Sequence, residues 1–260
     1  MSEGKLIYNK VGHAAHILFD HQAAYNALTH QMWCDLRDTC RRIADDPEVR
    51  VVIFRGVGGK AFISGTDISS FADFTSGQDG IDYERHIDEC MAAVDALPVA
   101  TIAVIEGWAV GGGLNIFCAS DFRIATPTAR FASPLGRTIG NCLSMSSCAR
   151  IAAAIGVTTA KRMLLLGETI AASELLDRGV LYGVAEPAEL DKAVSELSER
   201  AAANAPLTTR ASKEMIRRLT YANLPDVDDL ISLVYGSEDF RRGVRSFLAK
   251  KKTTPQWSGR

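Results

Sequence analysis

The sequence lacks long apolar runs, a paired-cysteine motif and an excess of charge of either sign. No hydrophobic stretch approaches the roughly 20 consecutive apolar residues needed to cross a bilayer, and residues 1–10 contain no apolar core behind a positively charged start. The 29 lysines and arginines are balanced by 31 aspartates and glutamates, without the basic clusters typical of nucleic-acid-binding or membrane-surface proteins. We therefore expect a cytoplasmic protein that binds a small molecule and neither nucleic acid nor a membrane.

The six cysteines form no C-x-x-C pair and show no metal-ligand spacing with histidine. They are scattered through mostly apolar segments, which predicts reduced core side chains and no metal site: Cys34, Cys40, Cys90, Cys118, Cys142 and Cys148. The sequence also lacks low-complexity linkers and repeats of fixed period. Because 260 residues with 47% hydrophobic content can bury a sizeable core, one main domain is expected.

The hydrophobic pattern predicts an α/β fold. Residues 6–8 and 14–19 alternate around a short turn, which indicates a β-hairpin. Apolar residues then recur at helical spacing from Thr29, a plausible N-cap, and an unalternated β-branched run at residues 51–54 is typical of a strand buried on both faces of a parallel sheet. The alternation of helix and buried strand implies right-handed βαβ crossovers.

The same order continues along the chain and then becomes helical. A helix is expected around residues 83–97, a buried strand at residues 101–105, and a second helix from a glycine turn at residues 111–115. After Arg150 the apolar spacing is mostly helical, and Pro206 is expected to open a helix at its tolerated first turn. The C-terminal third is therefore predicted to be a helical layer.

Two glycine-containing loops are the strongest candidates for chemistry. Residues 62–68 (FISGTDI) and 107–113 (GWAVGGG) each follow a strand, and the second leads into a helix. Glycines let the backbone approach a ligand, and the N–H groups at a helix start have no internal partner. Either loop can therefore present backbone donors to an oxyanion, although a triple glycine alone also serves to pack a helix on a sheet.

Taken in order, several segments resemble the crotonase, or enoyl-CoA hydratase/isomerase, superfamily. The resemblance covers roughly residues 5 to 250. The segments that carry it are residues 21–28 (HQAAYNAL), 64–67 (SGTD), 107–113 (GWAVGGG), 119–125 (ASDFRIA), 166–172 (LGETIAA), 179–181 (GVL) and 205–207 (APL).

The resemblance implies a spiral of ββα repeats with a C-terminal helical trimerisation region. It implies residues 1–200 as a core that binds acyl-CoA and residues 201–260 as a helical region that covers the site and forms a homotrimer or a dimer of trimers. The coenzyme A thioester would be the substrate, with no further cofactor. Its carbonyl would be held by the backbone N–H groups of Thr66 and Gly112, and such donors are each worth about 2.7–4 kcal/mol to an oxyanion in acyl-transfer precedents.

The resemblance also suggests which residues bind the substrate. Ala24, Ser64, Asp67 and Ile68 would line the pantetheine and adenine path, although an aspartate in such a loop more often caps a turn. Trp108 and Phe131 would shape an apolar acyl pocket or serve as core residues. The full predicted binding set is Ala24, Ser64, Gly65, Asp67, Ile68, Trp108, Gly111, Pro134, Arg137 and Asn141.

The sequence departs from the family where a hydratase carries two glutamates. These positions hold Asn115 and Leu135, and neither side chain accepts a proton near neutral pH. Because a positioned acid or base contributes about 10²–10⁴-fold, we expect poor crotonyl-CoA hydratase activity. Leu135 also argues against a single-glutamate isomerase of the ordinary kind. Asn141 replaces an aspartate that some relatives use, so neither dehalogenation nor dienoyl isomerisation carries over.

Three side chains could substitute for the missing acids, and each has an ordinary structural alternative. His86 is the best alternative base, although it also fits a solvated helix face. Cys142 is a nucleophile or a small buried hydrophobe. Arg137 could pair with a substrate carboxylate or form a surface ion pair.

The leading hypothesis is an acyl-CoA enzyme of the lyase or isomerase class that passes through a thioester enolate. The alternatives are a hydrolase, lyase or decarboxylase acting on an unusual acyl group, and a non-catalytic CoA-binding subunit.

Overall fold

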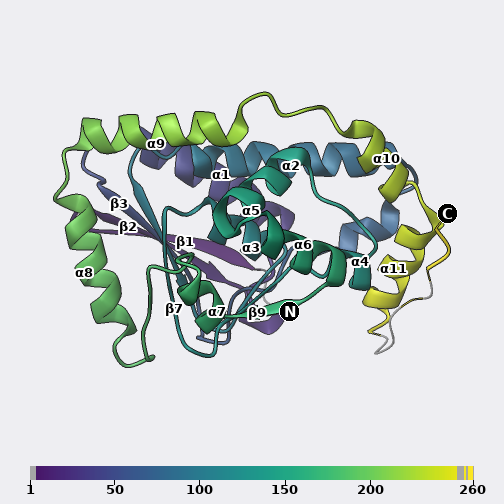
Figure 1. Ribbon diagram of the computed structural model, residues 1–260, viewed down its shortest axis with the longest axis horizontal. Helices are drawn as coiled ribbons and strands as arrows, with labels where there is room; N and C mark the ends of the chain where they lie inside the picture. Colours follow the sequence, from purple (N-terminus) through teal and green to yellow (C-terminus); the bar gives the residue numbers. More distant parts are fainter. Residues whose placement is uncertain (1–3, 251–254, 256, 260) are drawn as a thin grey trace.

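The computed structural model describes residues 4–250, 255 and 257–259. Its larger sheet has the strand order β1-β2-β3-β5-β7-β10 (Figure 1). The first two strands form the predicted antiparallel hairpin and the others pair in parallel. The strands are β1 (Lys5–Val11), β2 (Ala14–Asp20), β3 (Val51–Gly56), β5 (Ala100–Ile105), β7 (Phe122–Ala125) and β10 (Gly183–Val184).

Among the described residues, a smaller sheet has four strands, and three of them, β4, β6 and β8, directly follow strands of the larger sheet. Its order is β4 (Ala61–Ile63), β6 (Trp108–Val110), β8 (Arg130–Ala132) and β9 (Thr169–Ala171). The chain passes from β3 to β4, from β5 to β6 and from β7 to β8 across short turns, and a helix follows each pair. This arrangement is the ββα repeat expected from the resemblance, and the α/β class is confirmed.

The turn between β5 and β6 requires glycine. Gly107 has a φ of +67°, and a Cβ built on it would lie 1.9 Å from the Lys60 carbonyl oxygen. That close approach brings β4 and β6 side by side. Because the two strands are parallel, the glycine loops continue from the same end of both.

The helices of the first half follow the predicted patterns closely, with one difference. In α1 (His30–Ala44) the Thr29 side chain accepts the Met32 N–H, as expected of an N-cap. Helix α2 (Gly77–Asp95) begins six residues before the predicted start at residue 83. A reciprocal capping box between Ser76 and Asp79 nucleates this earlier turn.

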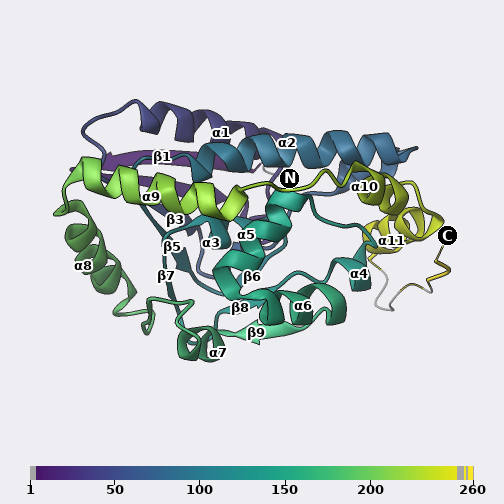
Figure 2. The same ribbon diagram turned by 45° about the horizontal axis from the view of Figure 1, so that its top comes forward.

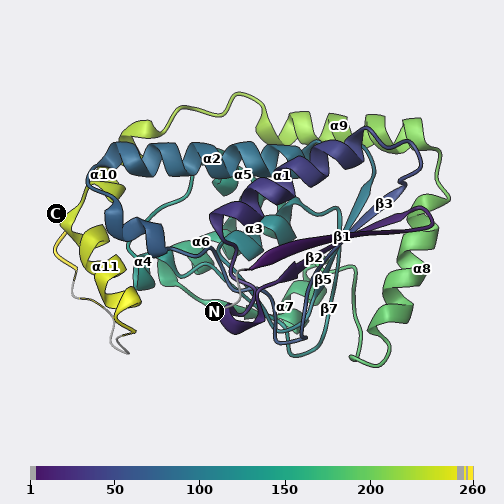
Figure 3. The same ribbon diagram turned by 180° about the vertical axis from the view of Figure 1, so that it is seen from behind.

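The remaining helices place the C-terminal region around the core. Helix α9 begins at Pro206 as predicted, and α8 lies at the end of the molecule opposite α10 and α11 (Figures 2 and 3). Helix α10 packs on α2, and α11 packs on η2 and α4. These elements are η1 (Gln22–Ala24), η2 (Ser69–Asp73), α3 (Gly112–Ala119), α4 (Leu135–Thr138), α5 (Met145–Ile155), α6 (Val157–Leu166), α7 (Ala172–Asp177), α8 (Leu190–Ala202), α9 (Pro206–Tyr221), α10 (Asp228–Tyr235) and α11 (Glu238–Leu248).

Burial agrees with the expected core. Every position of β5 is buried, as an unalternated apolar strand in a parallel sheet requires. All six cysteines are free, and Cys40, Cys90 and Cys118 are buried. Within the described ranges, no helix combines the length and apolarity needed to span a membrane.

Candidate active site

The two glycine loops meet at a cavity of about 140 Å³. Helix α2 forms one wall, α4 and the loop after it form another, and Phe247 of α11 closes the outer side. Ten of the residues predicted from the sequence line this cavity: Ser64, Gly65, Thr66, Ile68, Gly111, Gly112, Asn115, Pro134, Leu135 and Asn141.

The amides of Thr66 and Gly112 are placed at the junction of the loops. The Leu28 N–H donates to the Gly65 carbonyl over 2.9 Å and the Asp67 N–H to the Leu28 carbonyl over 2.8 Å, so the first loop is fixed on both sides of Thr66. Gly112 is the first residue of α3. Among the described residues neither the Thr66 nor the Gly112 N–H has an acceptor, as the first turn of a helix allows.

The loops touch each other closely at this point. The Trp33 Nε1–H donates to the Thr66 hydroxyl over 3.3 Å. A Cβ built on Gly112 would lie 3.1 Å from the same Thr66 oxygen and 2.9 Å from Trp33 Cζ2. Both free amides therefore border one cavity, and the lack of a side chain at residue 112 keeps it open.

Several predicted binding residues lie outside the cavity lining. The Ala24 carbonyl accepts the Ser64 hydroxyl over 3.0 Å, and Asp67 Oδ1 accepts the Ser69 N–H over 2.9 Å, which is the turn-capping role. Trp108 is 43% exposed on the surface of β6, and Phe131 packs on Phe117 in the core. These two aromatic side chains therefore do not shape the acyl cavity.

Arg137 is exposed and points away from the cavity. Its guanidinium donates to the Gly167 carbonyl over 3.3 Å. No arginine, lysine or histidine is present among the described residues that line the cavity. The structure thus provides no cation there for a substrate carboxylate, and the geometry does not favour the carboxylate-binding role considered for Arg137.

Asn115, which was predicted to stand where a hydratase carries a glutamate, is held in a buried polar network. Its Nδ2 donates to the Ser147 hydroxyl over 2.9 Å, and its Oδ1 accepts from Arg150 over 2.8 Å. Arg150 in turn pairs with Asp95 at 2.6 Å. Because both ends of the Asn115 amide are engaged, the side chain links α3 to α5.

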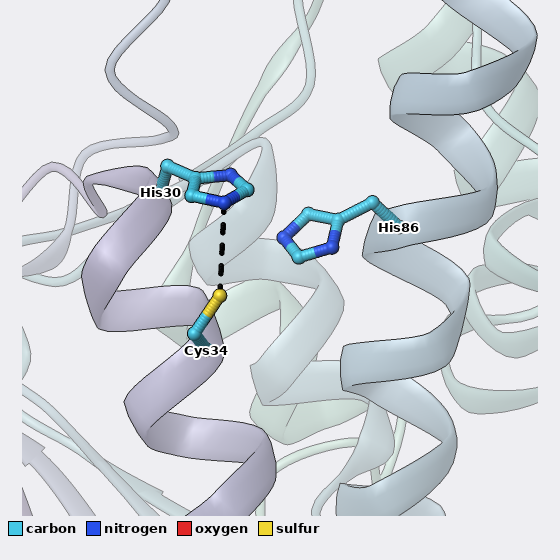
Figure 4. Close-up of side chains that lie close together, drawn as sticks. All are labelled: His30, Cys34 and His86. Carbon is cyan, nitrogen blue, oxygen red and sulfur yellow. Dashed lines mark hydrogen bonds between the residues drawn. The ribbon is translucent and has the colours of Figure 1, made fainter.

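His86 faces helix α1 rather than the cavity (Figure 4). Its ring stacks on that of His30 with a centroid separation of 4.5 Å. Burial and the nearby His30 ring lower the pKa of His86. The geometry gives no support to His86 as a base on the acyl group, because His86 does not line the cavity. The α2 side chains that do line it are Tyr83, Glu84 and Ile87.

His30, Cys34 and His86 are the described residues best arranged to hold a metal ion. Each offers one ligand atom, and these atoms lie within 4.8 Å of one another. The His30 Nε2 and Cys34 Sγ atoms are 3.7 Å apart, close to the edge of about 3.6 Å that tetrahedral zinc bond lengths imply. This group lies between α1 and α2, away from the acyl cavity.

Cys142 does not have the environment of a nucleophile. Burial raises the pKa of its thiol to about 12. A thiolate is therefore scarce near neutral pH, and the side chain packs as a small hydrophobe against the buried cluster that contains Ile139 and Tyr235.

Glu84 is a residue of the cavity lining that the sequence analysis did not single out. It lies on α2 with its carboxyl in the cavity wall, and it is only 3% exposed. The Tyr235 hydroxyl donates to its Oε1 over 2.7 Å, and the Ser144 N–H donates to its Oε2 over 2.8 Å. A signal was present in the sequence, because Glu84 interrupts the apolar face that Ile81 and Ile87 define.

The pKa of Glu84 is raised to about 7, chiefly because burial penalises the carboxylate. The hydrogen bonds from Tyr235 and Ser144 oppose this shift, and the like charge of Asp88 adds to it. The carboxyl group is therefore divided between its acid and base forms near neutral pH, which is the property that a proton-transfer group requires.

This shift predicts that the free energy of unfolding falls as the pH rises from about 4.5 to about 7. The folded protein retains the Glu84 proton in that range whereas the unfolded chain releases it, so the loss is on the order of 3 kcal/mol. Urea unfolding of the wild type, Glu84→Gln and the exposed control Glu89→Gln at pH 5 and pH 8 measures it. The decline should be smaller in Glu84→Gln alone. Equal declines in all three proteins would contradict the assignment.

Comparison with known proteins identifies the family. A sequence profile of the enoyl-CoA hydratase/isomerase family matches residues 10–260. The chain belongs to this family. The short-chain-enoyl-CoA hydratase of Clostridium acetobutylicum is 29% identical, with 97% of each chain covered. The (E)-benzylidenesuccinyl-CoA hydratase of Thauera aromatica is 32% identical over 90% of this chain and 92% of its own.

The similarity to a solved structure extends over the whole fold. A methylmalonyl-CoA decarboxylase in complex with 2-nitronate-propionyl-CoA superposes with a TM-score of 0.88 at 25% identity, covering 98% of both chains. The proteins similar to this chain are thus named for more than one reaction, and family membership alone does not choose among them.

Proposed function

We propose that this member of the enoyl-CoA hydratase/isomerase family processes an acyl-CoA thioester through an enolate. The observation that carries the proposal is the pair of Thr66 and Gly112 amides, which lack acceptors among the described residues and border one cavity. Two fixed N–H dipoles stabilise the negative charge that develops on a thioester oxygen. The hydratases and the decarboxylase complex described above are relatives named for CoA thioesters, which supports the same class of ligand here.

The acyl group is proposed to be neutral and apolar. Ile68, Phe71, Ile87, Ile139 and Phe247 line the cavity, and the described lining contains no basic side chain. An apolar acyl chain would bury these surfaces, whereas a second carboxylate would be left without a cation. The thioester is proposed to be the substrate without a further cofactor.

Hydration of crotonyl-CoA is expected to be about 10²–10⁴-fold slower than in a hydratase with both glutamates. Asn115 is tied to Ser147 and Arg150, and Leu135 offers no proton. Steady-state hydration rates beside a two-glutamate control enzyme measure this difference. Efficient hydration would show that another group activates water.

A decarboxylase is the second candidate, favoured by the structural similarity to methylmalonyl-CoA decarboxylase. Incubation with a panel of enoyl-, 3-hydroxyacyl-, dienoyl- and carboxyacyl-CoA thioesters, with products read by mass, separates the candidates. Release of carbon dioxide from a carboxyacyl-CoA would favour the decarboxylase. Tight CoA binding with no product from any thioester would instead indicate a binding subunit.

We propose a homotrimer or a dimer of trimers as the assembled form. Helix α9 has no buried residue, and Leu207, Met215, Ile216 and Leu219 are strongly exposed on it. Such side chains are expected to pack against another copy of the chain. Analytical ultracentrifugation should give three or six times the chain mass of 28.1 kDa, and a monomer would refute the assembly.

A further inference from the structure

Glu84 belongs to a buried polar cluster on the cavity side of α2. Its carboxyl accepts from Tyr235 of α10 and from the Ser144 backbone at the start of α5. Asn141 Nδ2 donates to the same Tyr235 oxygen over 3.3 Å. Glu84 and Asn141 both line the cavity that the oxyanion amides border.

The cluster leaves hydrogen-bonding capacity unused. Asn141 Oδ1 is a buried polar atom for which the structure gives no partner among the described residues. Buried polar groups are nearly always paired, so an unpaired oxygen at a cavity points to a ligand that supplies the missing donor. The polar side of the cavity is therefore built to meet substrate and not only to hold α2 against α10.

The Glu84 carboxyl group has no cation among the described titratable groups that perturb it. Tyr83 and Asp88 are its titratable neighbours on α2, Tyr235 faces it from α10, and none of these carries a positive charge. Burial of a carboxylate without a cation is costly. A glutamine would avoid that cost, but it offers one acceptor oxygen where Glu84 uses two, and it cannot exchange a proton.

We propose that Glu84 is the acid–base residue of this site and moves a proton between two carbons of an enoyl-CoA. The proposal rests on the enolate function assigned above and adds the group that forms and resolves the enolate. It replaces the two missing glutamates with one carboxyl group from a different helix.

The reaction that a single carboxyl group supports is migration of a double bond. In a 3-enoyl-CoA the Glu84 carboxylate takes a proton from C2, and the C–H electron pair passes into a dienolate held by the Thr66 and Gly112 amides. The protonated Glu84 then returns the proton to C4, and the double bond settles between C2 and C3. The carboxylate is regenerated, and neither water nor a redox partner is consumed.

Tyr235 is a positioning residue in this scheme. Its hydroxyl donates to Glu84 Oε1 and thereby stabilises the carboxylate form. Removing it in Tyr235→Phe should raise the pKa of Glu84 further and move the acidic limb of the pH–rate profile to higher pH. A merely structural tyrosine would lower activity without moving that limb.

The test uses two reactions of the full-length protein. But-3-enoyl-CoA is followed to crotonyl-CoA, and butyryl-CoA is followed for exchange of its C2 protons in D₂O by mass spectrometry. Wild type and Glu89→Gln, an exposed control on the same helix, should act equally. Glu84→Gln should be about 10²–10⁴-fold slower in both reactions, while circular dichroism and butyryl-CoA binding stay unchanged.

The outcomes separate this proposal from the proposed function. A Glu84→Gln protein that binds butyryl-CoA and exchanges its protons at the wild-type rate overturns the role of Glu84 and leaves the enolate site standing. A wild-type protein that binds the thioester without exchange overturns the acid–base role and favours a binding subunit. Failure of the wild type to bind any thioester overturns the proposed function itself. If Glu84→Gln does not fold, Glu84→Asp should fold and show reduced turnover with an altered acidic limb, and a wild-type rate and profile would contradict the role.

Discussion

Replacement of Gly112 by proline is expected to lower turnover of an acyl-CoA thioester by about 10²–10³-fold, because it removes one of two backbone donors to the enolate oxygen. Gly112 is the first residue of α3, a position at which proline is compatible with a helix. The fold should therefore survive the change. The measurement is kcat on the most reactive thioester of the panel, together with the binding constant for a saturated acyl-CoA.

Gly112→Ala is the matched control for this experiment. Both variants add a Cβ atom, which would lie 2.9 Å from Trp33 Cζ2 and 3.1 Å from the Thr66 hydroxyl oxygen. Only the alanine variant retains the backbone N–H. The loss in the proline variant beyond that in the alanine variant is the contribution of the amide. Equal losses would mean that Gly112 matters only for space and that its amide does not contact the enolate.

Asp95→Ala is expected to lower the free energy of unfolding by about 3–5 kcal/mol. The change leaves the Arg150 guanidinium buried without its anionic partner, and the side chains of Arg150 and Asp95 are only 4% and 10% exposed. It also removes the carboxylate that accepts a hydrogen bond over 2.9 Å from the hydroxyl of Tyr221, which lies on α9. Urea unfolding at constant pH provides the measurement.

Two further variants show whether burial is the cause. Asp95→Ala combined with Arg150→Met should be more stable than Asp95→Ala alone, because the second change removes the unpaired charge. Glu214→Ala breaks a solvent-exposed cluster with Arg217 and Arg218 and should cost much less stability than Asp95→Ala, because water screens these charges. If Asp95→Ala cost no more than Glu214→Ala, the buried network would not be a major source of stability.

The parts of the fold that sequence could predict are those with local causes. The hairpin, the Thr29 cap, the buried strand at β3 and the two glycine loops each depend on residues near one another in the chain. The start of α2 was missed because the Ser76–Asp79 capping box lies in a polar segment without a hydrophobic stripe.

The acid–base side of the site could not be found in the same way. Glu84 and Tyr235 are separated by 151 positions, and only the packing of α10 on α2 brings their oxygens to 2.7 Å. His86 was favoured because its helix was expected to wall the acyl pocket, but its ring stacks on His30 and does not line the cavity. The family pattern pointed to the two glycine loops that border the cavity, whereas the environment that shifts the pKa of Glu84 exists only in the folded chain.

The Tyr235–Glu84 hydrogen bond also couples the site to the order in which the chain folds. Thr66 and Gly112 come from the first half of the sequence, whereas their proposed acid–base partner is oriented by a helix near its C-terminal end. Contacts of such long sequence separation form late, because they carry the greatest loop-closure entropy. A chain whose early repeats have folded before α10 docks would therefore possess the oxyanion donors and remain inactive until its last helices are in place.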